Sequence, residues 1–275
     1  NCCALWLRCV MSIEDEFQKC VYGPVRSWRF GLSLGIDPIF HNSTCSFSCI
    51  YCQLGNIQNI TDKRDEFVST SKVVGDFREF SQKNIPYDVI TFSGNGEPSL
   101  AKNFAQMSLG IRELATHKPQ FILTNGTLLN DSEVRDDLKL MDKVIIKLDA
   151  CSEEQYSAVN RPAGGLSFLK LIDGIIKFKS EYNGEIEIQS MFLPINSNQI
   201  EEFADLVNQI SPQCVQVNLP KRPYPSVWSR HHRGNHELEF KCDFNWLKTI
   251  SEGQVKSILK TLSEKTKVEL ISPLR

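Results

Sequence analysis

The segment "HNSTCSFSCIYCQLGN" (41–56) holds three cysteines, Cys45, Cys49 and Cys52, in a C-x3-C-x2-C array. A tetrahedral zinc site needs four ligands, and a cubane iron–sulfur cluster has four iron corners. Three thiolates would bind three irons of a [4Fe–4S] cubane and leave the fourth iron open for a non-protein ligand. The array therefore predicts a cluster that binds a cofactor or a substrate directly. The alternatives are a zinc knuckle that takes a distant fourth ligand and a buried group of thiols.

The composition of the whole chain favours a globular protein that works in a reducing compartment. Its 275 residues are 41% apolar, which is enough for one large domain with small extensions. The ten cysteines are unevenly spaced in a long chain, which favours metal binding over a disulfide framework. The formal net charge of −2 gives no overall signal for nucleic-acid binding, and we expect no DNA partner.

No segment of the sequence is long and apolar enough to predict a membrane span. The opening "NCCALWLRCVM" (1–11) is short, is interrupted by Arg8 and lacks a small-residue cleavage site. Met11 is a candidate for the natural start, which would make residues 1–10 an upstream extension. We therefore predict a cytoplasmic protein without a membrane partner.

Strand-like and helix-like segments alternate along most of the chain. The strand-like runs are rich in Val, Ile and Phe, and Gly, Pro or Asn residues bound them. Amphipathic helical patterns lie between them, such as the apolar face formed by Val73, Phe77 and Phe80. This order predicts an α/β protein with a parallel sheet or an incomplete barrel. The six predicted strands are 35–40, 87–92, 120–124, 143–149, 185–193 and 214–219.

Polar residues follow one face of three successive predicted strands. Lys147 and Asp149 share a face of the strand 143–149, and Glu187, Gln189 and Met191 share a face of the next. Gln216 and Asn218 repeat the pattern on the third. In a barrel the outer face must be apolar to pack against helices, so a polar face must line the lumen. The stripe predicts a lumen that holds a polar ligand. The alternative is a set of edge strands whose polar face meets water.

The segment "TFSGNGEPSL" (91–100) lies where the second predicted strand ends and a helix begins. Gly94 and Gly96 permit a close backbone approach, and Glu97 suits the first helical turn. Taken alone, this pattern also fits an ordinary strand-to-helix turn. Asn125 and Asp149 stand at the ends of two further strands, so a ring of polar groups is expected at this edge.

The cysteine array, with the aromatic residue Tyr51 before its last cysteine, resembles the radical S-adenosylmethionine (radical SAM) superfamily. The resemblance implies an incomplete (βα)6 barrel whose cluster is held by Cys45, Cys49 and Cys52. It further implies that S-adenosylmethionine binds the open iron through its amino and carboxylate groups. An electron from the cluster then cleaves the sulfonium, and the 5′-deoxyadenosyl radical abstracts hydrogen from a substrate. A low-potential electron donor, such as flavodoxin or ferredoxin, is implied as a partner.

The resemblance also assigns residues to S-adenosylmethionine. The segment 94–97 resembles the family's Gly-Gly-Glu type motif, which receives the ammonium group, although it is one residue longer than the simplest form. Polar residues at the strand ends and in the lumen are implied to surround the rest of the cofactor. The expected cofactor-binding residues are Tyr51, Gly94, Asn95, Gly96, Glu97, Asn125, Asp149 and Gln189. No catalytic side chain is assigned.

Two further segments, 21–38 and 147–162, resemble a group of small Fe–S oxidoreductases related to the wyosine-type tRNA-modifying branch. Arg26, Trp28 and Phe30 depart from the group's common pattern. The resemblance spans roughly residues 21–225. It implies a 21–240 core domain, an N-terminal extension at 1–20 and a small helical C-terminal appendage at 241–275.

The segment "KRPYPSVWSRHHRGNHE" (221–237) is predicted to cover the barrel mouth and to contact a large anionic substrate, for which RNA is the candidate. It carries Lys221, Arg222, Arg230 and Arg233 against the single acid Glu237. Its aromatic residues, Tyr224 and Trp228, would stack on unpaired bases. A rigid, proline-rich connection is the alternative. For the whole protein, the alternatives are a glycyl-radical activase of a partner protein and a non-catalytic Fe–S or zinc module.

Overall fold

The computed structural model describes residues 18–220, 222–228, 233 and 243–273. All six predicted strands are present and run parallel to one another, in the order in which they follow along the chain. They are β2 (Gly31–Ile36), β5 (Val89–Phe92), β6 (Gln120–Thr124), β7 (Lys143–Lys147), β8 (Glu185–Met191) and β9 (Cys214–Asn218). The first strand lies earlier than predicted, because Asp37 turns the chain by accepting hydrogen bonds from the amides of Ile39 and Phe40.

Two more strands extend this sheet at its edges. β1 (Val21–Ser27) pairs antiparallel with β2, and β12 (Glu269–Ile271) pairs parallel with β9. The eight strands are ordered β1-β2-β5-β6-β7-β8-β9-β12. The six parallel strands are therefore flanked by the antiparallel strand β1 at one edge and by the parallel strand β12 at the other. The predicted fold, an incomplete (βα)6 barrel, is confirmed.

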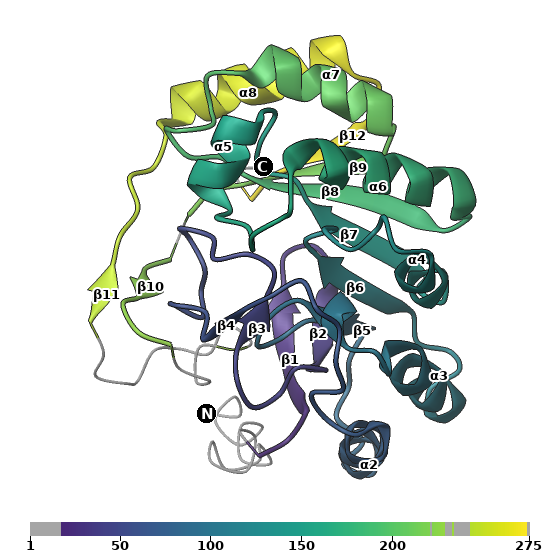
Figure 1. Ribbon diagram of the computed structural model, residues 1–275. Helices are drawn as coiled ribbons and strands as arrows, with labels where there is room; N and C mark the ends of the chain where they lie inside the picture. The colour runs from purple at the N-terminus through teal and green to yellow at the C-terminus, as the bar shows by residue number, and fades with distance from the viewer. Residues whose placement is uncertain (1–17, 221, 229–232, 234–242, 274–275) are drawn as a thin grey trace, which may run out of the picture.

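The connecting helices cover the outer side of the sheet, as Figure 1 shows for the right and top of the view. The apolar face predicted for 73–80 is buried in α2, where Ser69 caps the helix by accepting from the amide of Lys72. Leu114, the last residue of the helix Phe104–Leu114, is 39% exposed. The helices are α2 (Thr70–Ser81), α3 (Phe104–Leu114), α4 (Ser132–Leu138), α5 (Glu153–Val159), α6 (Phe168–Glu181), α7 (Ile200–Ile210) and α8 (Glu252–Lys265), with a 3-10 turn, η1 (Pro98–Leu100).

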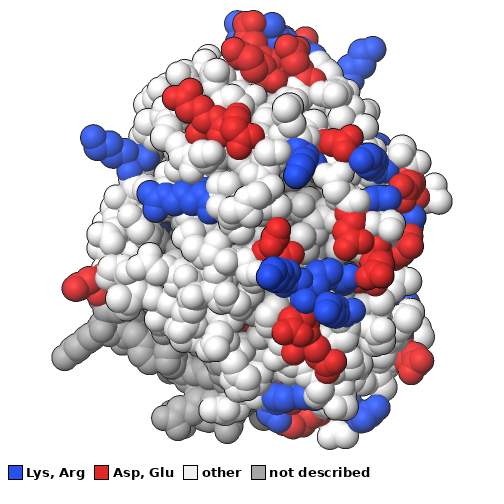
Figure 2. All heavy atoms as spheres, viewed as in Figure 1, with Lys and Arg blue, Asp and Glu red and all other residues white. Residues whose placement is uncertain are grey.

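The main core lies between the sheet and these helices. Strand residues such as Ile90 and Ile146 are fully buried against helix residues such as Phe104 and Ile175. Burying each such side chain contributes about 1.5–3 kcal/mol. On the outer surface, Lys and Arg side chains are interspersed with Asp and Glu over the helical side (Figure 2).

The opposite side of the sheet carries the loops that build the site. Two short strand pairs lie there, to the left of the sheet in Figure 1. β3 (Thr44–Cys45) pairs with β4 (Asn59–Ile60), and β10 (Tyr224–Pro225) pairs with β11 (Phe244–Asn245). The cysteine segment and the segment after β9 therefore both belong to this side.

The C-terminal segment of the chain contributes to the main sheet. β12 comes from the predicted appendage 241–275 and is the eighth strand of the main sheet, while α8 packs on α7. The described part of this segment thus continues the core. Most of the predicted extension 1–20 lies outside the described residues, although Cys20 is fully buried. No described helix is long and apolar enough to cross a membrane.

Candidate cofactor site

The first cysteine is positioned by the glycine-rich turn after β5. The amide of Thr44 donates to the carbonyl of Asn95, and the amide of Glu97 donates to the carbonyl of Thr44, both at 3.0 Å. Gly96 lies between these bonds, where a Cβ atom would be 1.7 Å from the Thr44 oxygen. Only glycine permits this approach, so the turn and Cys45 are held at a fixed separation.

The other two cysteines rest on the segment that follows α5. The amides of Ser48 and Ile50 donate to the carbonyls of Asn160 and Val159, at 3.0 Å each. The side chain of Asn160 lies 3.4 Å from the Cys49 sulfur and donates its amide to it. Sequence analysis assigned no role to Asn160, although it lies in 147–162, one of the segments that resemble the family.

All three thiols line one cavity of about 560 Å³. Burial raises the pKa of all three thiols. For Cys49 it raises the pKa to about 12. The described residues contain no set of three His, Cys, Asp or Glu side chains arranged to hold a metal ion. Three thiols spread around one cavity fit a cubane, because each thiolate there binds a different iron.

Most residues predicted to contact the cofactor line this same cavity. The structure brings to it Tyr51, Gly94, Gly96, Glu97, Asn125 and Gln189. Lys147 and Met191 also line it, as the predicted polar stripe requires. Two predicted residues, Asn95 and Asp149, are buried outside its wall.

Asn95 and Asp149 support the wall from behind. The Asn95 side chain donates to the carbonyl of Phe40 at 2.7 Å and so points away from the cavity. Asp149 accepts a hydrogen bond from the hydroxyl of Tyr51 and another from Asn160 at 2.8 Å. Both residues therefore position neighbouring groups of the wall, and their contacts with the cofactor stay predictions.

Asp149 also forms an ion pair at the cavity wall. Its second carboxylate oxygen accepts from the amide of Met191 at 2.7 Å and pairs with Lys147 at 3.0 Å. The Lys147 ammonium lies 4.9 Å from the centre of the Tyr51 ring. Tyr51 is therefore fixed at both its hydroxyl and its ring face.

Glu97 is buried at the end of β5 and is heavily hydrogen-bonded. Its carboxylate accepts from the amide and hydroxyl of Ser99, from the Thr124 hydroxyl and from the Asn125 amide, at 2.6–3.1 Å. Burial raises the pKa of Glu97, and these four bonds oppose that rise. These four bonds give Glu97 a structural role that its sequence pattern did not reveal, and its contact with the ammonium group stays a prediction.

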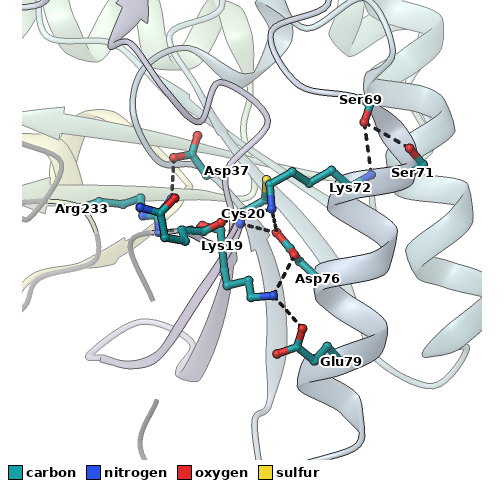
Figure 3. Close-up of polar contacts among 10 residues, drawn as sticks. Lys19, Cys20, Asp37, Ser69, Ser71, Lys72, Asp76, Glu79 and Arg233 are labelled. Atoms are coloured by element: carbon teal, nitrogen blue, oxygen red, sulfur yellow. Dashed lines mark hydrogen bonds and ion pairs between the residues drawn. The ribbon is translucent and has the colours of Figure 1, made fainter. Parts of the chain in front are cut away.

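The segment after β9 is tied to the cysteine side by a buried ion pair. Arg233 was expected to face an anionic substrate, but its guanidinium lies 2.9 Å from Asp37 and also donates to the carbonyl of Lys19 at 3.0 Å (Figure 3). The Tyr22 ring centre is 4.7 Å away. This pairing is internal because both side chains are almost fully buried. Lys221, Arg230 and Glu237 lie outside the described residues.

The comparison with family models agrees with this geometry. Residues 39–207 match the model described as the Radical SAM superfamily, which is more than half of the chain. The chain therefore belongs to the radical SAM superfamily. The family uses a [4Fe–4S] cluster and S-adenosylmethionine, and its members cleave S-adenosylmethionine reductively.

Individual proteins and solved structures are also similar to this chain. It is 44% identical over 217 residues to the UPF0026 protein slr1464 of Synechocystis sp., covering 78% of this chain and 81% of that protein. Its fold resembles Streptococcus suis SuiB bound to S-adenosylmethionine, with a TM-score of 0.60, 14% identity and coverage of 88% of this chain. The chain spans 50% of the length of SuiB. It also resembles TYW1 with a lysine-pyruvate adduct bound, with a TM-score of 0.59, 14% identity and coverage of 89% and 78% of the two chains.

Proposed function

We propose that this protein binds a [4Fe–4S] cluster through Cys45, Cys49 and Cys52 and uses it to cleave S-adenosylmethionine for hydrogen abstraction from a substrate. The observation that carries the proposal is that the three thiols and the 94–97 turn line one cavity. When bound, the cluster supplies an electron at low potential, and the 5′-deoxyadenosyl radical derived from the cofactor performs the abstraction.

The protein's own residues would tune and shield that chemistry. Side-chain amides lie near two of the sulfur atoms, with Asn160 at 3.4 Å from Cys49 and Asn125 at 3.6 Å from Cys45. Hydrogen bonds to cluster sulfurs influence the reduction potential, so both amides would set the potential of the cluster. Burial of the site limits access of water to a reactive intermediate.

The cavity offers S-adenosylmethionine both backbone and side-chain groups. Gly94 and Gly96 expose backbone at the wall, while Asn125 and Gln189 supply side-chain amides. Apolar wall residues such as Leu54 and Leu123 suit the adenosine part. These groups lie on the same cavity as the thiols, as binding to an open iron requires.

An external low-potential protein such as flavodoxin or ferredoxin would deliver the electron. Cys49 and Cys52 also line a second cavity of about 240 Å³, together with Asn56, Arg161 and Tyr224. The cysteine segment thus separates two openings, and one of them is available to a reductant while S-adenosylmethionine occupies the other.

An RNA substrate remains a prediction. Of the residues that suggested it, Arg222 and Tyr224 line the main cavity, whereas Arg233 is paired with Asp37. Support for RNA binding therefore rests on fewer basic groups than the sequence indicated.

Anaerobic reconstitution with iron and sulfide tests the proposed function. We expect about four irons per chain and a reduced-cluster paramagnetic resonance signal that changes when S-adenosylmethionine is added. A signal that does not change when S-adenosylmethionine is added, or a preparation that retains only zinc, would contradict the proposal and favour a non-catalytic metal module.

A further inference from the structure

The cavity has more positive charge on its wall than its carboxylates can neutralise. Lys147 is paired with Asp149, and Arg233 is paired with Asp37. Glu97 is the acidic residue on the wall, and its four hydrogen bonds are to neutral donors. Three further cations line the cavity with no carboxylate at ion-pair distance within the described ranges, namely Arg26, Arg29 and Arg222.

Arg29 is the most constrained of these three residues. It lies in the turn between β1 and β2, and its guanidinium crosses to β9 to donate to Gln216 at 2.7 Å. Its carbon centre lies 5.7 Å from the Trp28 ring and 5.0 Å from the Phe30 ring, which restricts the guanidinium between them. Its Nε atom is buried and has no hydrogen-bond partner.

A buried guanidinium nitrogen without a hydrogen-bond partner is costly, so Arg29 is held in place at an energetic cost. Burial lowers the pKa of Arg29 to about 10, and nearby Glu187 opposes this shift. That carboxylate is already engaged, because it accepts hydrogen bonds from Lys143 and from the side chain of Gln216. Arg29 therefore remains charged near neutral pH with its Nε donor unused.

S-adenosylmethionine does not supply the missing negative charge. At pH 7 its carboxylate is ionised, its amine is protonated and its sulfonium is permanently positive, so the molecule is a net cation. A [4Fe–4S] cluster held by three thiolates would carry a net charge of about −1 when oxidised and about −2 when reduced, which offsets the charge of this cofactor. Neither group places a carboxylate beside Arg26, Arg29 and Arg222, so a second, anionic ligand suits these three side chains.

We propose that the substrate is a small molecule with a dianionic group, a phosphate or a pair of carboxylates, which binds Arg29 with Arg26 and Arg222 beside it. The inference rests on the proposed function, because it assumes that S-adenosylmethionine shares the cavity. Guanidinium groups suit such anions because they donate two parallel hydrogen bonds. A volume of about 560 Å³ is within the range of small-molecule sites, and the half-buried position of Arg29 on the wall favours a ligand that enters the cavity.

Calorimetric titration of the reconstituted protein, saturated with S-adenosylmethionine, tests this inference with three probes. Phenyl phosphate and phthalate carry the two candidate anions on an aromatic ring, and benzamide is the neutral counterpart. We expect one of the anions to bind at least tenfold more tightly than benzamide. The tighter of the two identifies phosphate or dicarboxylate as the recognised group.

Variants assign the binding to Arg29. We expect Arg29→Gln to weaken the preferred anion tenfold or more and Arg29→Lys to weaken it less. Arg26→Gln and Arg222→Gln change exposed side chains, so they test the site even if Arg29 variants fail to fold. The control Arg78→Gln alters an exposed arginine on α2 and should leave binding unchanged.

Equal binding of benzamide and both anions, or anion binding unchanged in the three cavity variants, would overturn the inference. Its failure is distinguishable from failure of the proposed function, because cluster content and S-adenosylmethionine cleavage are measured separately. A protein that cleaves S-adenosylmethionine but shows no anion preference refutes only the substrate class.

Discussion

Glu97 links the ends of two neighbouring strands through a single carboxylate. One of its oxygens accepts from Ser99 and Thr124, and the other accepts from the amide of Asn125. The carboxylate therefore links the turn after β5 to the end of β6, and both segments line the cavity. Its sequence neighbours suggested direct contact with S-adenosylmethionine, whereas its hydrogen bonds indicate support of the wall.

We predict that Glu97→Gln lowers the free energy of unfolding by about 1–3 kcal/mol. Glutamine replaces one carboxylate oxygen with an NH2 donor, so either the Asn125 amide or the Ser99 and Thr124 donors lose their acceptor. Urea unfolding of the protein before reconstitution measures this loss. Glu113→Gln changes an exposed carboxylate and should remain within about 0.5 kcal/mol of the parent. Unchanged stability together with weaker S-adenosylmethionine binding would instead support direct contact with the ammonium.

A second residue-scale prediction concerns the buried pair of Arg233 and Asp37. Arg233→Met leaves the carboxylate of Asp37 buried without its cation, which costs about 3–5 kcal/mol when one partner of a buried pair is removed. Arg222→Gln changes an exposed arginine from the same segment and should shift stability by less than about 0.5 kcal/mol. Thermal and urea unfolding give both values. Equal effects of the two changes would show that Arg233 does not anchor the segment in solution.

At the scale of elements, the cysteine segment and the glycine-rich turn form one unit. Thr44 bridges to Gly96, so displacement of the turn would move Cys45 with it. The cysteine spacing and the strand-end position of 94–97 could be predicted from the sequence. The contact of Asn160 with Cys49 could not be predicted from the sequence. It is a tertiary contact that arises because the C-terminal end of α5 lies beside the cysteine segment, and no local sequence pattern indicates it.

We predict that Gly96→Ala prevents cluster assembly while leaving most of the fold intact. The added methyl group would lie 1.7 Å from the Thr44 carbonyl oxygen, so the two segments must separate. Iron content and the visible absorbance after anaerobic reconstitution report the loss. Gly164→Ala is the matched control, because its added methyl group meets nothing within 4 Å. Full iron loading of the Gly96 variant would contradict the claim that this bridge positions Cys45.

For the whole molecule, sheet order was more predictable than domain limits. Alternating strand and helix patterns gave the six parallel strands, because their apolar periodicity reflects burial on one side. β1 and β12 were not assigned to the sheet, since a short edge strand has little periodicity of its own. From the polar stripe on β8 and β9, Gln189, Met191 and Asn218 line the cavity. The hydrogen bond from Arg29 to Gln216 could not be predicted, because it depends on the long crossing from the first hairpin.

Because β12 joins the main sheet and α8 packs on α7, we predict that the C-terminal segment unfolds together with the rest of the protein. Leu262 is fully buried in α8, so Leu262→Ala should cost about 2–5 kcal/mol. Circular dichroism and tryptophan fluorescence should show a single shared transition at a lower urea concentration. Leu169→Ala changes a side chain that is 77% exposed and should have little effect. A separate early transition for the Leu262 variant would show that the segment is an independent appendage.

The most direct test of the account is formation of 5′-deoxyadenosine by reconstituted protein supplied with S-adenosylmethionine and dithionite, without added substrate. We predict product from the parent protein and from Cys214→Ala, whose buried cysteine lies at the start of β9. We predict none above background from Cys45→Ala, Cys49→Ala or Cys52→Ala, because loss of one thiolate leaves an iron without its protein ligand. Product at the parent rate from the Cys49 variant would contradict the assignment of these three cysteines to the cluster.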